Sequence, residues 1–285
     1  MKAMESPVEP AAASPESDLC RLEAIVAGYG PTLTAYSGGV DSSVVAVVAA
    51  RALGAAALAV TGVSASLSKF ESAAAASLAG KLGLEHRLVD TNELSSPEYR
   101  ANSGDRCYHC KAELFDRLTE IARQEGFSAV ASGDNQYDLG DHRPGMRAGE
   151  ERFVRRPLVE AGLGKERVRA LARHLGLPNH DKPATPCLAS RVPHGVSVDA
   201  SVLSRVERAE GVLRDLGFGL FRVRHHDDVA RVELPEADMD RALLRRREIV
   251  AGLREAGYRW VTLDLSGFRS GGLNVVLVNG RATRP

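Results

Sequence analysis

Apolar residues in the first 180 positions come in short runs that alternate with longer blocks of helical spacing. Short apolar runs are typical of buried strands, and the longer blocks are typical of helices that pack on a sheet. The predicted strands are 32–36, 56–61, 86–90 and 128–132, and the predicted helices are 42–53, 69–83, 110–125 and 165–175. Alternating strands and helices form a parallel sheet with helices on both faces, so we expect a doubly wound α/β fold.

The pattern changes after Gly195, where Arg and Glu become frequent. The expected elements are a helix over 198–216, strands at 220–226 and 229–234, a helix over 236–256 and a strand at 258–264. This order predicts a small α+β domain. We therefore divide the chain into a leader of residues 1–17, a main domain of residues 18–195 and a small domain of residues 196–285. The leader has little to bury and is expected to be disordered, so that Asp18 caps the first helix.

A short polar sequence, Ser37-Gly-Gly-Val-Asp-Ser-Ser43, lies between the first strand and the helix that follows it. A strand, a tight glycine turn and a helix N-terminus present free backbone N–H groups, which bind anions such as phosphate. The carboxylate in this sequence suits a Mg²⁺ ion beside the phosphates. The alternative is an ordinary glycine–serine turn. The predicted phosphate-binding residues are Ser37, Gly38, Gly39, Val40, Asp41, Ser42 and Ser43.

The polar sequence after the fourth strand carries Asp134, Asp138 and Asp141. In a doubly wound sheet this turn lies at the same carboxyl edge as the glycine turn. Carboxylates there could hold Mg²⁺ against a triphosphate. An ordinary hydrophilic loop is the alternative, since Asp and Asn favour turns.

Four cysteines without a recognisable export signal point to the cytoplasm, where thiols stay reduced. Cys107 and Cys110 have the spacing of zinc sites, iron–sulfur clusters and redox dithiols, although two unrelated helix-start cysteines would have it too. Cys187 lies in residues 181–195, where three prolines and a glycine predict an extended, rigid loop. The neighbouring Arg191 favours the reactive thiolate, and a structural loop with a buried thiol is the alternative.

Arg222 and Arg224 lie two apart on a predicted strand and therefore face the same side. Such a pair forms a fork for a phosphate or carboxylate, and a solvated charged face is the alternative. Basic and acidic residues balance at 37 each, so no overall charge draws the chain to nucleic acid. Arg, Gly and Lys interrupt the alanine-rich segments, so we expect no membrane-spanning helix.

The sequence of residues 37–43 resembles the PP-loop of the ATP pyrophosphatases, which cleave ATP between its α and β phosphates. It lacks the Gly-Lys-Ser/Thr ending of a Walker P-loop, so transfer of the γ phosphate is the weaker interpretation. With Cys187-Leu-Ala-Ser-Arg191 and Gly267-Phe-Arg-Ser-Gly-Gly-Leu-Asn274, the chain resembles the LarE family over residues 19–277. The resemblance implies an enzyme that adenylates the carboxylates of pyridinium-3,5-dicarboxylate mononucleotide. It then converts them to thiocarboxylates for the nickel-pincer cofactor of lactate racemase.

The resemblance also implies roles for single residues. The PP-loop would hold pyrophosphate, Asp134 would belong to a second ATP loop, and Cys187 would match the sulfur-bearing cysteine. Residues associated with the phosphate end of the substrate are Lys111, Ser190, Arg191, Arg222, Arg224 and Arg269. The implied ligands are ATP, Mg²⁺ and a small-molecule nucleotide substrate, with a sulfide donor as a partner. Family members assemble into hexamers, and neither nucleic acid nor a membrane is an expected partner.

Two sulfur schemes occur in this family. Some members sacrifice one cysteine, which becomes dehydroalanine, and others use three cysteines to hold a [4Fe–4S] cluster. Cys107, Cys110 and Cys187 would supply three thiolates and leave one iron free to carry an extra sulfide. We expect the cluster scheme, because a C-x-x-C pair beside Lys111 has no role in the sacrificial one.

Three other functions compete with this one. A PP-loop enzyme that thiolates tRNA is the first, although the balanced charge and the lack of a recognisable RNA-binding module argue against it. The second is an amide-forming ligase that uses ammonia on an adenylate, in which the cysteines would be structural. The third is a nucleotide-binding module without catalysis that a zinc site holds together.

Overall fold

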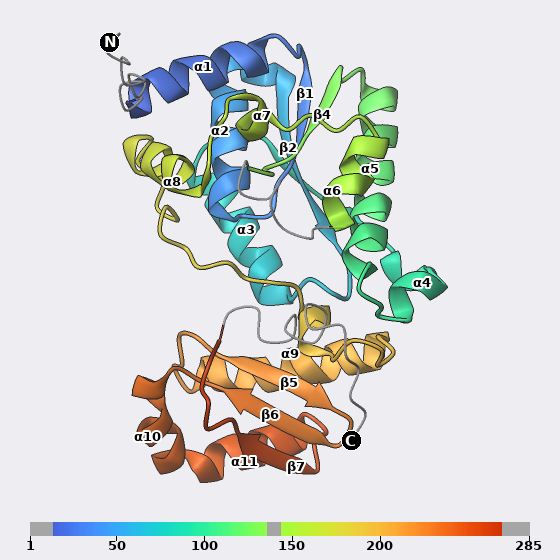
Figure 1. Cartoon of the computed structure of the whole chain (residues 1–285), viewed down its shortest axis with the longest axis vertical. Coiled ribbons are helices and arrows are strands. Elements are labelled where there is room, and N and C mark those ends of the chain that lie inside the picture. The colour runs from blue at the N-terminus through green and yellow to red at the C-terminus, as the bar shows by residue number, and fades with distance from the viewer. Residues whose placement is uncertain (1–13, 136–143, 270–285) are drawn as a thin grey trace, which may run out of the picture.

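Two sheets organise the structure (Figure 1). The computed structural model describes residues 14–135 and 144–269. A parallel four-stranded sheet and its helices occupy the upper part of Figure 1, and a three-stranded sheet lies in the lower part. The predicted fold class, an α/β fold with a parallel sheet between helices, is confirmed. Within the described residues, no helix is long and apolar enough to cross a membrane.

The larger sheet has the strand order β3-β2-β1-β4, and all neighbouring strands are parallel. Its strands are β1 (Thr32–Ala35), β2 (Ala57–Val63), β3 (His86–Asp90) and β4 (Ala129–Ala131). Every residue of β1 is buried, as expected for a central strand covered on both faces. Since β2 and β3 lie on one side of β1 and β4 on the other, the loops after β1 and β4 meet at a topological switch point, where open α/β sheets bind ligands.

Helices cover both faces of this sheet. The helices of this part of the chain are α1 (Pro15–Ala27), α2 (Val40–Leu53), α3 (Lys69–Lys81), α4 (Pro97–Arg100), α5 (Arg106–Glu125), α6 (Pro144–Glu151), α7 (Pro157–Glu160) and α8 (Lys165–His174). Figure 1 shows α1, α2, α3 and α8 on one side of the sheet and α5 and α6 on the other. Val44 and Val48 of α2 are buried against α1 and α8, and Phe115 and Leu118 of α5 are buried against the opposite face. Two apolar layers therefore enclose the strands.

The smaller sheet has the order β5-β6-β7. In it, β5 (Arg222–His226) is antiparallel to β6 (Val229–Glu233), and β7 (Trp260–Leu263) is parallel to β6. Its helices are α9 (Ala200–Asp215), α10 (Glu236–Leu244) and α11 (Arg246–Glu255). Leu213 and Leu253 are buried in a core of their own beside this sheet. This separate core supports the proposed division of the chain into a main and a small domain.

The N-terminal helix begins earlier than the sequence predicts. Helix α1 starts at Pro15, and the Ser14 side chain caps it by accepting a hydrogen bond from the backbone N–H of Ser17. A Ser–Pro pair is a strong helix start, so the expected disorder is wrong for residues 14–17, and the rest of the leader lies outside the described residues. Asp18 is therefore not the cap but a buried helix residue, to which Arg167 donates.

The single helix expected over residues 236–256 is wrong, because the structure has two helices there. Arg245 adopts φ −92° and ψ +10° between α10 and α11. Three consecutive arginines at 245–247 offer no apolar side chain to the core, and the break occurs at the first of them. Packing resumes on the second helix at Ile249, which is buried.

Candidate active site

The glycine loop, residues 37–43, connects β1 to α2. Gly38 has φ +67°, which glycine adopts without strain, and a Cβ there would lie 3.0 Å from the backbone of α3. Gly39 is the N-cap of α2 and makes no side-chain cap hydrogen bond, so no capping side chain covers the first N–H groups of the helix. The Ser42 hydroxyl accepts a hydrogen bond from the Ser37 backbone N–H at 3.2 Å and closes the loop. This geometry suits a bound anion.

The loop after β4 lies directly against the glycine loop. A Cβ on Gly133 would be 2.7 Å from the backbone nitrogen of Ser42, so the contact requires glycine. Asn135 donates from Nδ2 to Oδ2 of Asp41 at 3.2 Å. The predicted second loop, which carries Asp134, and the glycine loop are therefore packed on each other at the carboxyl edge of the sheet.

Carboxylates at this edge fit a Mg²⁺ ion bound with a nucleotide. Asp41 and Asp134 belong to the two adjoining loops, and Asp134 accepts a hydrogen bond from the Ser132 hydroxyl at 2.6 Å. Mg²⁺ needs only one or two protein carboxylates when phosphate oxygens and water complete its coordination. The other predicted ligands, Asp138 and Asp141, lie outside the described residues.

Three cysteines, Cys107, Cys110 and Cys187, come from distant parts of the sequence and are called the thiol cluster below. Two lie in the first turns of α5, and Cys187 precedes a 3₁₀ helix, Leu188–Arg191. Burial raises the pKa of Cys110 well above its ordinary value, and the charges of Glu93 and Cys187 raise it further. Desolvation also raises the pKa of Cys107, and Cys187 is again the next cause. Both thiols of α5 therefore lie within electrostatic reach of Cys187.

A network around Asn102 connects the two segments that carry the thiol cluster. Asn102 is fully buried and has φ +53°. Its Nδ2 donates to the carbonyl oxygens of Pro193 and Val196 at 2.7 and 2.9 Å. Arg106, at the start of α5, donates to the carbonyl oxygen of Ala189 at 2.9 Å. These bonds tie the start of the cysteine-bearing helix to the loop of the third cysteine.

The Cys187 loop is also attached to the larger sheet. The backbone N–H of Leu188 donates to the carbonyl oxygen of Ser66 at 2.9 Å, just beyond the end of β2. The hydroxyls of Ser64 and Ser66 in turn donate to Glu93, whose side chain is buried. Because β2 is the neighbour of β1, Cys187 lies at the same carboxyl edge of the sheet as the glycine loop.

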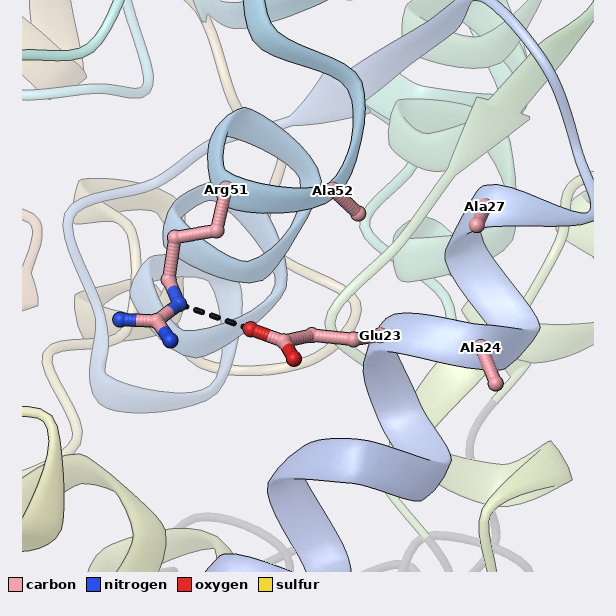
Figure 2. A pocket seen from close by; sticks show the side chains of 5 residues that line it. All are labelled: Glu23, Ala24, Ala27, Arg51 and Ala52. Atoms are coloured by element: carbon pink, nitrogen blue, oxygen red, sulfur yellow. Dashed lines mark hydrogen bonds and ion pairs between the residues drawn. The ribbon is translucent and has the colours of Figure 1, made fainter.

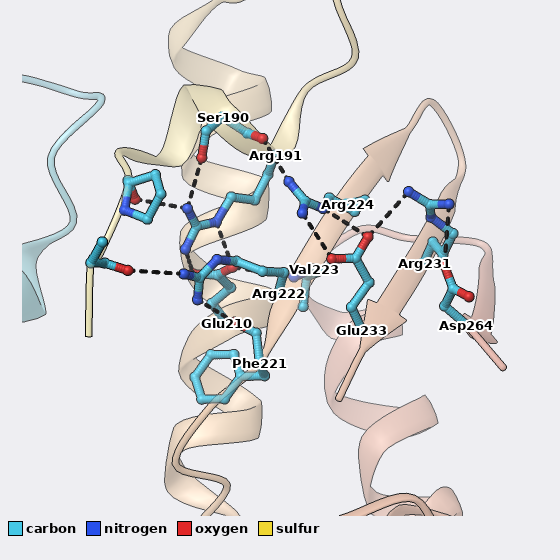
Figure 3. Close-up of polar contacts among 12 residues, drawn as sticks. Ser190, Arg191, Glu210, Phe221, Arg222, Val223, Arg224, Arg231, Glu233 and Asp264 are labelled. Carbon is cyan, nitrogen blue, oxygen red and sulfur yellow. Dashed lines mark hydrogen bonds and ion pairs between the residues drawn. The ribbon is translucent and has the colours of Figure 1, made fainter. Parts of the chain in front are cut away.

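Two of the predicted phosphate-binding arginines are already paired with carboxylates (Figure 3). Arg191 donates to both carboxylate oxygens of Glu210 at 2.8 and 3.1 Å, and Arg224 does the same with Glu233 at 2.9 and 2.8 Å. Ser190 joins the two pairs, since its hydroxyl accepts from Arg191 and its carbonyl accepts from Arg224. Both pairs are buried, and removing one partner would leave an uncompensated charge. They therefore hold the Cys187 loop against the small sheet.

Arg222 differs from these two arginines. Among the described residues, its guanidinium donates only to backbone carbonyls, those of Phe221 at 2.6 Å and Ala184 at 3.4 Å. Burial lowers the pKa of Arg222 to about 10, and the charge of Arg191 lowers it as well. A buried guanidinium with backbone partners alone keeps the capacity to bind an anion.

The remaining predicted phosphate ligands, Arg269 and Lys111, come from two different places. Arg269 is exposed and follows Phe268, whose ring centre lies 5.0 Å from the Arg222 guanidinium. Lys111 directly follows the C-x-x-C pair on α5, with Nζ 5.1 Å from the ring centre of Phe115. The first belongs with the arginines of the small domain and the second with the thiol cluster.

The sequence did not predict several buried polar residues at this site. They are Glu93, Asn102, Asn179, Glu210 and Glu233. Asn102 could have been noticed, because Asn before Ser-Gly tolerates a left-handed backbone. Glu93, Asn179 and Glu210 give no local signal, since their partners are far away in the sequence, whereas Glu233 lies on the strand that pairs with that of Arg224.

A shallow hollow between α1 and α2 contains none of the predicted site residues (Figure 2). It is lined by Glu23, Ala24, Ala27, Arg51 and Ala52, and Arg51 Nε is paired with Glu23 Oε1 at 2.8 Å. It lies at the C-terminal end of α2, whereas the glycine loop lies at the N-terminal end. We assign it no role in the candidate site.

Comparisons with known proteins agree with this geometry. Residues 29–98, which include the glycine loop, match the asparagine synthase family. An uncharacterized protein of Synechocystis sp. is 45% identical over 264 residues, 92% of this chain and 98% of that protein. The pyridinium-3,5-bisthiocarboxylic acid mononucleotide synthase of Lactiplantibacillus plantarum is 40% identical over 250 residues, 87% of this chain and 90% of that enzyme. With this identity over nearly the full length, and with a PP-loop at the carboxyl edge of its sheet, the chain belongs to the LarE family of ATP-dependent sulfur transferases.

Proposed function

We propose that this chain converts the carboxylates of pyridinium-3,5-dicarboxylate mononucleotide into thiocarboxylates at the expense of ATP. The name of the Lactiplantibacillus relative supports this substrate. The observation that carries the proposal is the hydrogen bond from Leu188 to Ser66, which attaches the cysteine loop to the carboxyl edge that also bears the glycine loop. An ATP site and a sulfur site are then within one catalytic region.

The first step is adenylation of a carboxylate. A carboxylate oxygen of the substrate attacks the α phosphorus of ATP, a new P–O bond forms, and the bond to the β phosphate breaks to release pyrophosphate. In this proposal the glycine loop supplies N–H groups to the departing pyrophosphate, and Asp41 and Asp134 of the two adjoining loops would hold Mg²⁺. Stabilising the charge that develops on a leaving group is usually a large part of catalysis.

The second step replaces the adenylate by sulfur. A sulfur nucleophile attacks the carbonyl carbon, a C–S bond forms, and AMP leaves with the former carboxylate oxygen. In the sacrificial scheme the nucleophile is Sγ of Cys187, and the thioester that forms then breaks at its Cβ–Sγ bond with loss of the Cα proton, which leaves dehydroalanine and the thiocarboxylate. In the cluster scheme the nucleophile would be sulfide, which gives the thiocarboxylate directly, and Cys187 would be one of the residues that hold the cluster. A second round of both steps treats the other carboxylate.

The three cysteines of the thiol cluster fit a [4Fe–4S] cluster in ligand type and in neighbourhood. Cys107 and Cys110 both lie within electrostatic reach of Cys187, and thiolates are the usual ligands of such clusters. Among the described residues, no three Cys, His, Asp or Glu side chains are already close enough to hold a metal ion, so binding would require the cysteines to move together. A bound cluster would supply an iron position that accepts sulfide.

We therefore expect protein purified without oxygen to contain iron and acid-labile sulfide, about four of each per chain. Replacing Cys107 by serine should remove both, because the ligand set then loses one of its three thiolates. Iron and sulfide are measured colorimetrically on both proteins. Iron-free protein that still forms product, with loss of hydrogen sulfide from Cys187 in its mass spectrum, would favour the sacrificial scheme instead.

We propose that Arg222 binds the substrate phosphate, while Arg191 and Arg224 keep structural roles. Arg222→Gln should raise the KM for the substrate roughly 10- to 100-fold, about the loss of one charge-assisted hydrogen bond, without lowering the unfolding temperature. Arg224→Gln should lower the unfolding temperature, because it leaves Glu233 buried with less compensation. Steady-state kinetics and thermal melts of both variants check this. An unchanged KM in the Arg222 variant would remove the assignment.

The adenylation proposal is tested by incubating the full chain with ATP, Mg²⁺ and the dicarboxylate nucleotide. We expect AMP and pyrophosphate to appear only when the nucleotide is present. Formation of ADP, or release of pyrophosphate that requires tRNA, would contradict the proposal and favour another class of enzyme. A hexameric assembly and a cytoplasmic location stay predictions.

A further inference from the structure

Asn179 has no role in the function proposed above, but its side chain is hydrogen-bonded to the glycine loop. It lies in the turn after α8, and its side chain is 9% exposed. Its Nδ2 donates to the carbonyl oxygen of Gly38 at 3.2 Å and to the Ser43 hydroxyl at 3.0 Å. Its Oδ1 has no hydrogen-bond partner among the described residues. The Asn179 amide is therefore hydrogen-bonded both to the glycine turn and to the first turn of α2.

Holding the Gly38 carbonyl fixes a backbone N–H that faces the other way. The carbonyl of Gly38 and the N–H of Gly39 belong to one planar, trans peptide unit, so they point in opposite directions. Gly38 has φ +67°, and as a glycine it has no side chain to prevent this peptide from flipping. The bond from Asn179 supplies that restraint and keeps the N–H of Gly39, the N-cap of α2, on the opposite side of the peptide, where it donates to the Ser37 hydroxyl of the loop at a long 3.4 Å.

Asn179 is itself held in place by its neighbours. Leu177 is buried in the core between α2 and α8. Arg169 of α8 donates to the carbonyl oxygens of His180 and Lys182, both at 3.1 Å. The Lys182 ammonium is paired with Glu71 of α3 at 2.8 Å. Because the segment that carries Asn179 is held on both sides, its side chain can fix the orientation of the Gly38 peptide.

We propose that Asn179 is a positioning residue for pyrophosphate release: it orients the Gly39 N–H toward the β and γ phosphates of ATP. The inference rests on the proposed adenylation. The new element is that the affinity for phosphate depends on a residue outside the glycine loop, in the segment that continues to Cys187. The Asn179 side chain thereby connects the glycine loop, which would bind the leaving group, to the segment that leads to Cys187.

The test is the affinity of the full chain for pyrophosphate with Mg²⁺, measured by isothermal titration calorimetry. Asn179→Ala removes the donor without adding charge, and Asn179→Asp keeps the shape but turns the donor into an acceptor. We expect both variants to bind pyrophosphate about 10- to 100-fold more weakly, the equivalent of one hydrogen bond to a charged group. Asn92→Ala and Asn92→Asp, the same changes at an exposed residue, are expected to bind like the unaltered chain.

Thermal melts of all five proteins separate positioning from a merely structural role. A structural Asn179 would lower the unfolding temperature and leave the affinity of the folded protein unchanged, and that outcome overturns the inference while the proposed function stands. A chain without substitutions that binds neither ATP nor pyrophosphate overturns the proposed function and the inference with it. Weaker binding in both Asn179 variants, at a temperature where the melts show them folded, supports the inference.

Discussion

Replacing Cys187 with alanine should abolish thiocarboxylate formation and leave adenylation intact. The glycine loop and its contacts do not involve the Cys187 side chain, so ATP still binds and the carboxylate is still activated. Without Sγ, no sulfur reaches the adenylate, which water then hydrolyses to AMP and the original acid. We expect product to fall by about 1000-fold or more, as for loss of a nucleophile, while pyrophosphate still appears. Mass spectrometry of the product and a pyrophosphate assay on the same sample measure both.

Cys20→Ala is the matched control for this variant. Cys20 is an exposed residue of α1, on the side of the sheet away from α5, and its removal should change neither product nor pyrophosphate. Normal thiolation by the Cys187 variant would contradict the proposed sulfur site. Normal product with ammonia in place of sulfide would identify an amide-forming ligase, in which the cysteines are structural.

Gly133→Ala should strongly weaken ATP binding. The added Cβ would lie 2.7 Å from the backbone nitrogen of Ser42 and 2.9 Å from its Cα, and backbone atoms at the start of α2 cannot rotate away as a side chain can. The two loops must therefore separate, which displaces the N–H groups that face the phosphates. Overpacking of this kind costs about 1–3 kcal/mol, or roughly 5- to 150-fold in affinity if the strain falls on the bound state. Calorimetric titration with ATP measures the change.

Gly80→Ala serves as the control for the Gly133 variant. Gly80 lies in α3, a Cβ there has no atom within 4 Å, and alanine is the better helix former. This variant should bind ATP normally and be equally or more stable. If Gly133→Ala bound ATP as tightly as Gly80→Ala does, the packing of the two loops would not be part of the nucleotide site.

The fold was predictable where the sequence pattern is local. Short apolar runs identified the four strands of the larger sheet, and the Gly-Gly sequence identified the turn between β1 and α2, where we predict the anion site. The helix break at Arg245 was missed, because a charged stretch on a surface helix looks the same whether the helix continues or not. The early start of α1 was missed, because the composition of the leader outweighed the Ser14–Pro15 cap signal.

The partners of the site residues could not be predicted in this way. Arg191, Arg222 and Arg224 look alike in the sequence, and only the fold brings Glu210 to the first and Glu233 to the third. The Arg191–Glu210 contact joins a loop to a helix, and the Arg224–Glu233 contact joins the paired strands β5 and β6, whose register the sequence pattern did not predict. The structure therefore separates Arg191 and Arg224, which pair with carboxylates, from Arg222, which among the described residues donates to backbone carbonyls.

The most direct test of the account follows an oxygen atom. If a carboxylate of the substrate attacks the α phosphorus of ATP and sulfur later displaces AMP, one carboxylate oxygen must leave with the AMP. Substrate labelled with ¹⁸O in its carboxylates should therefore yield AMP that carries one ¹⁸O atom for each thiocarboxylate formed, with unlabelled pyrophosphate. Unlabelled AMP, or label in phosphate or pyrophosphate, would contradict the proposed adenylation.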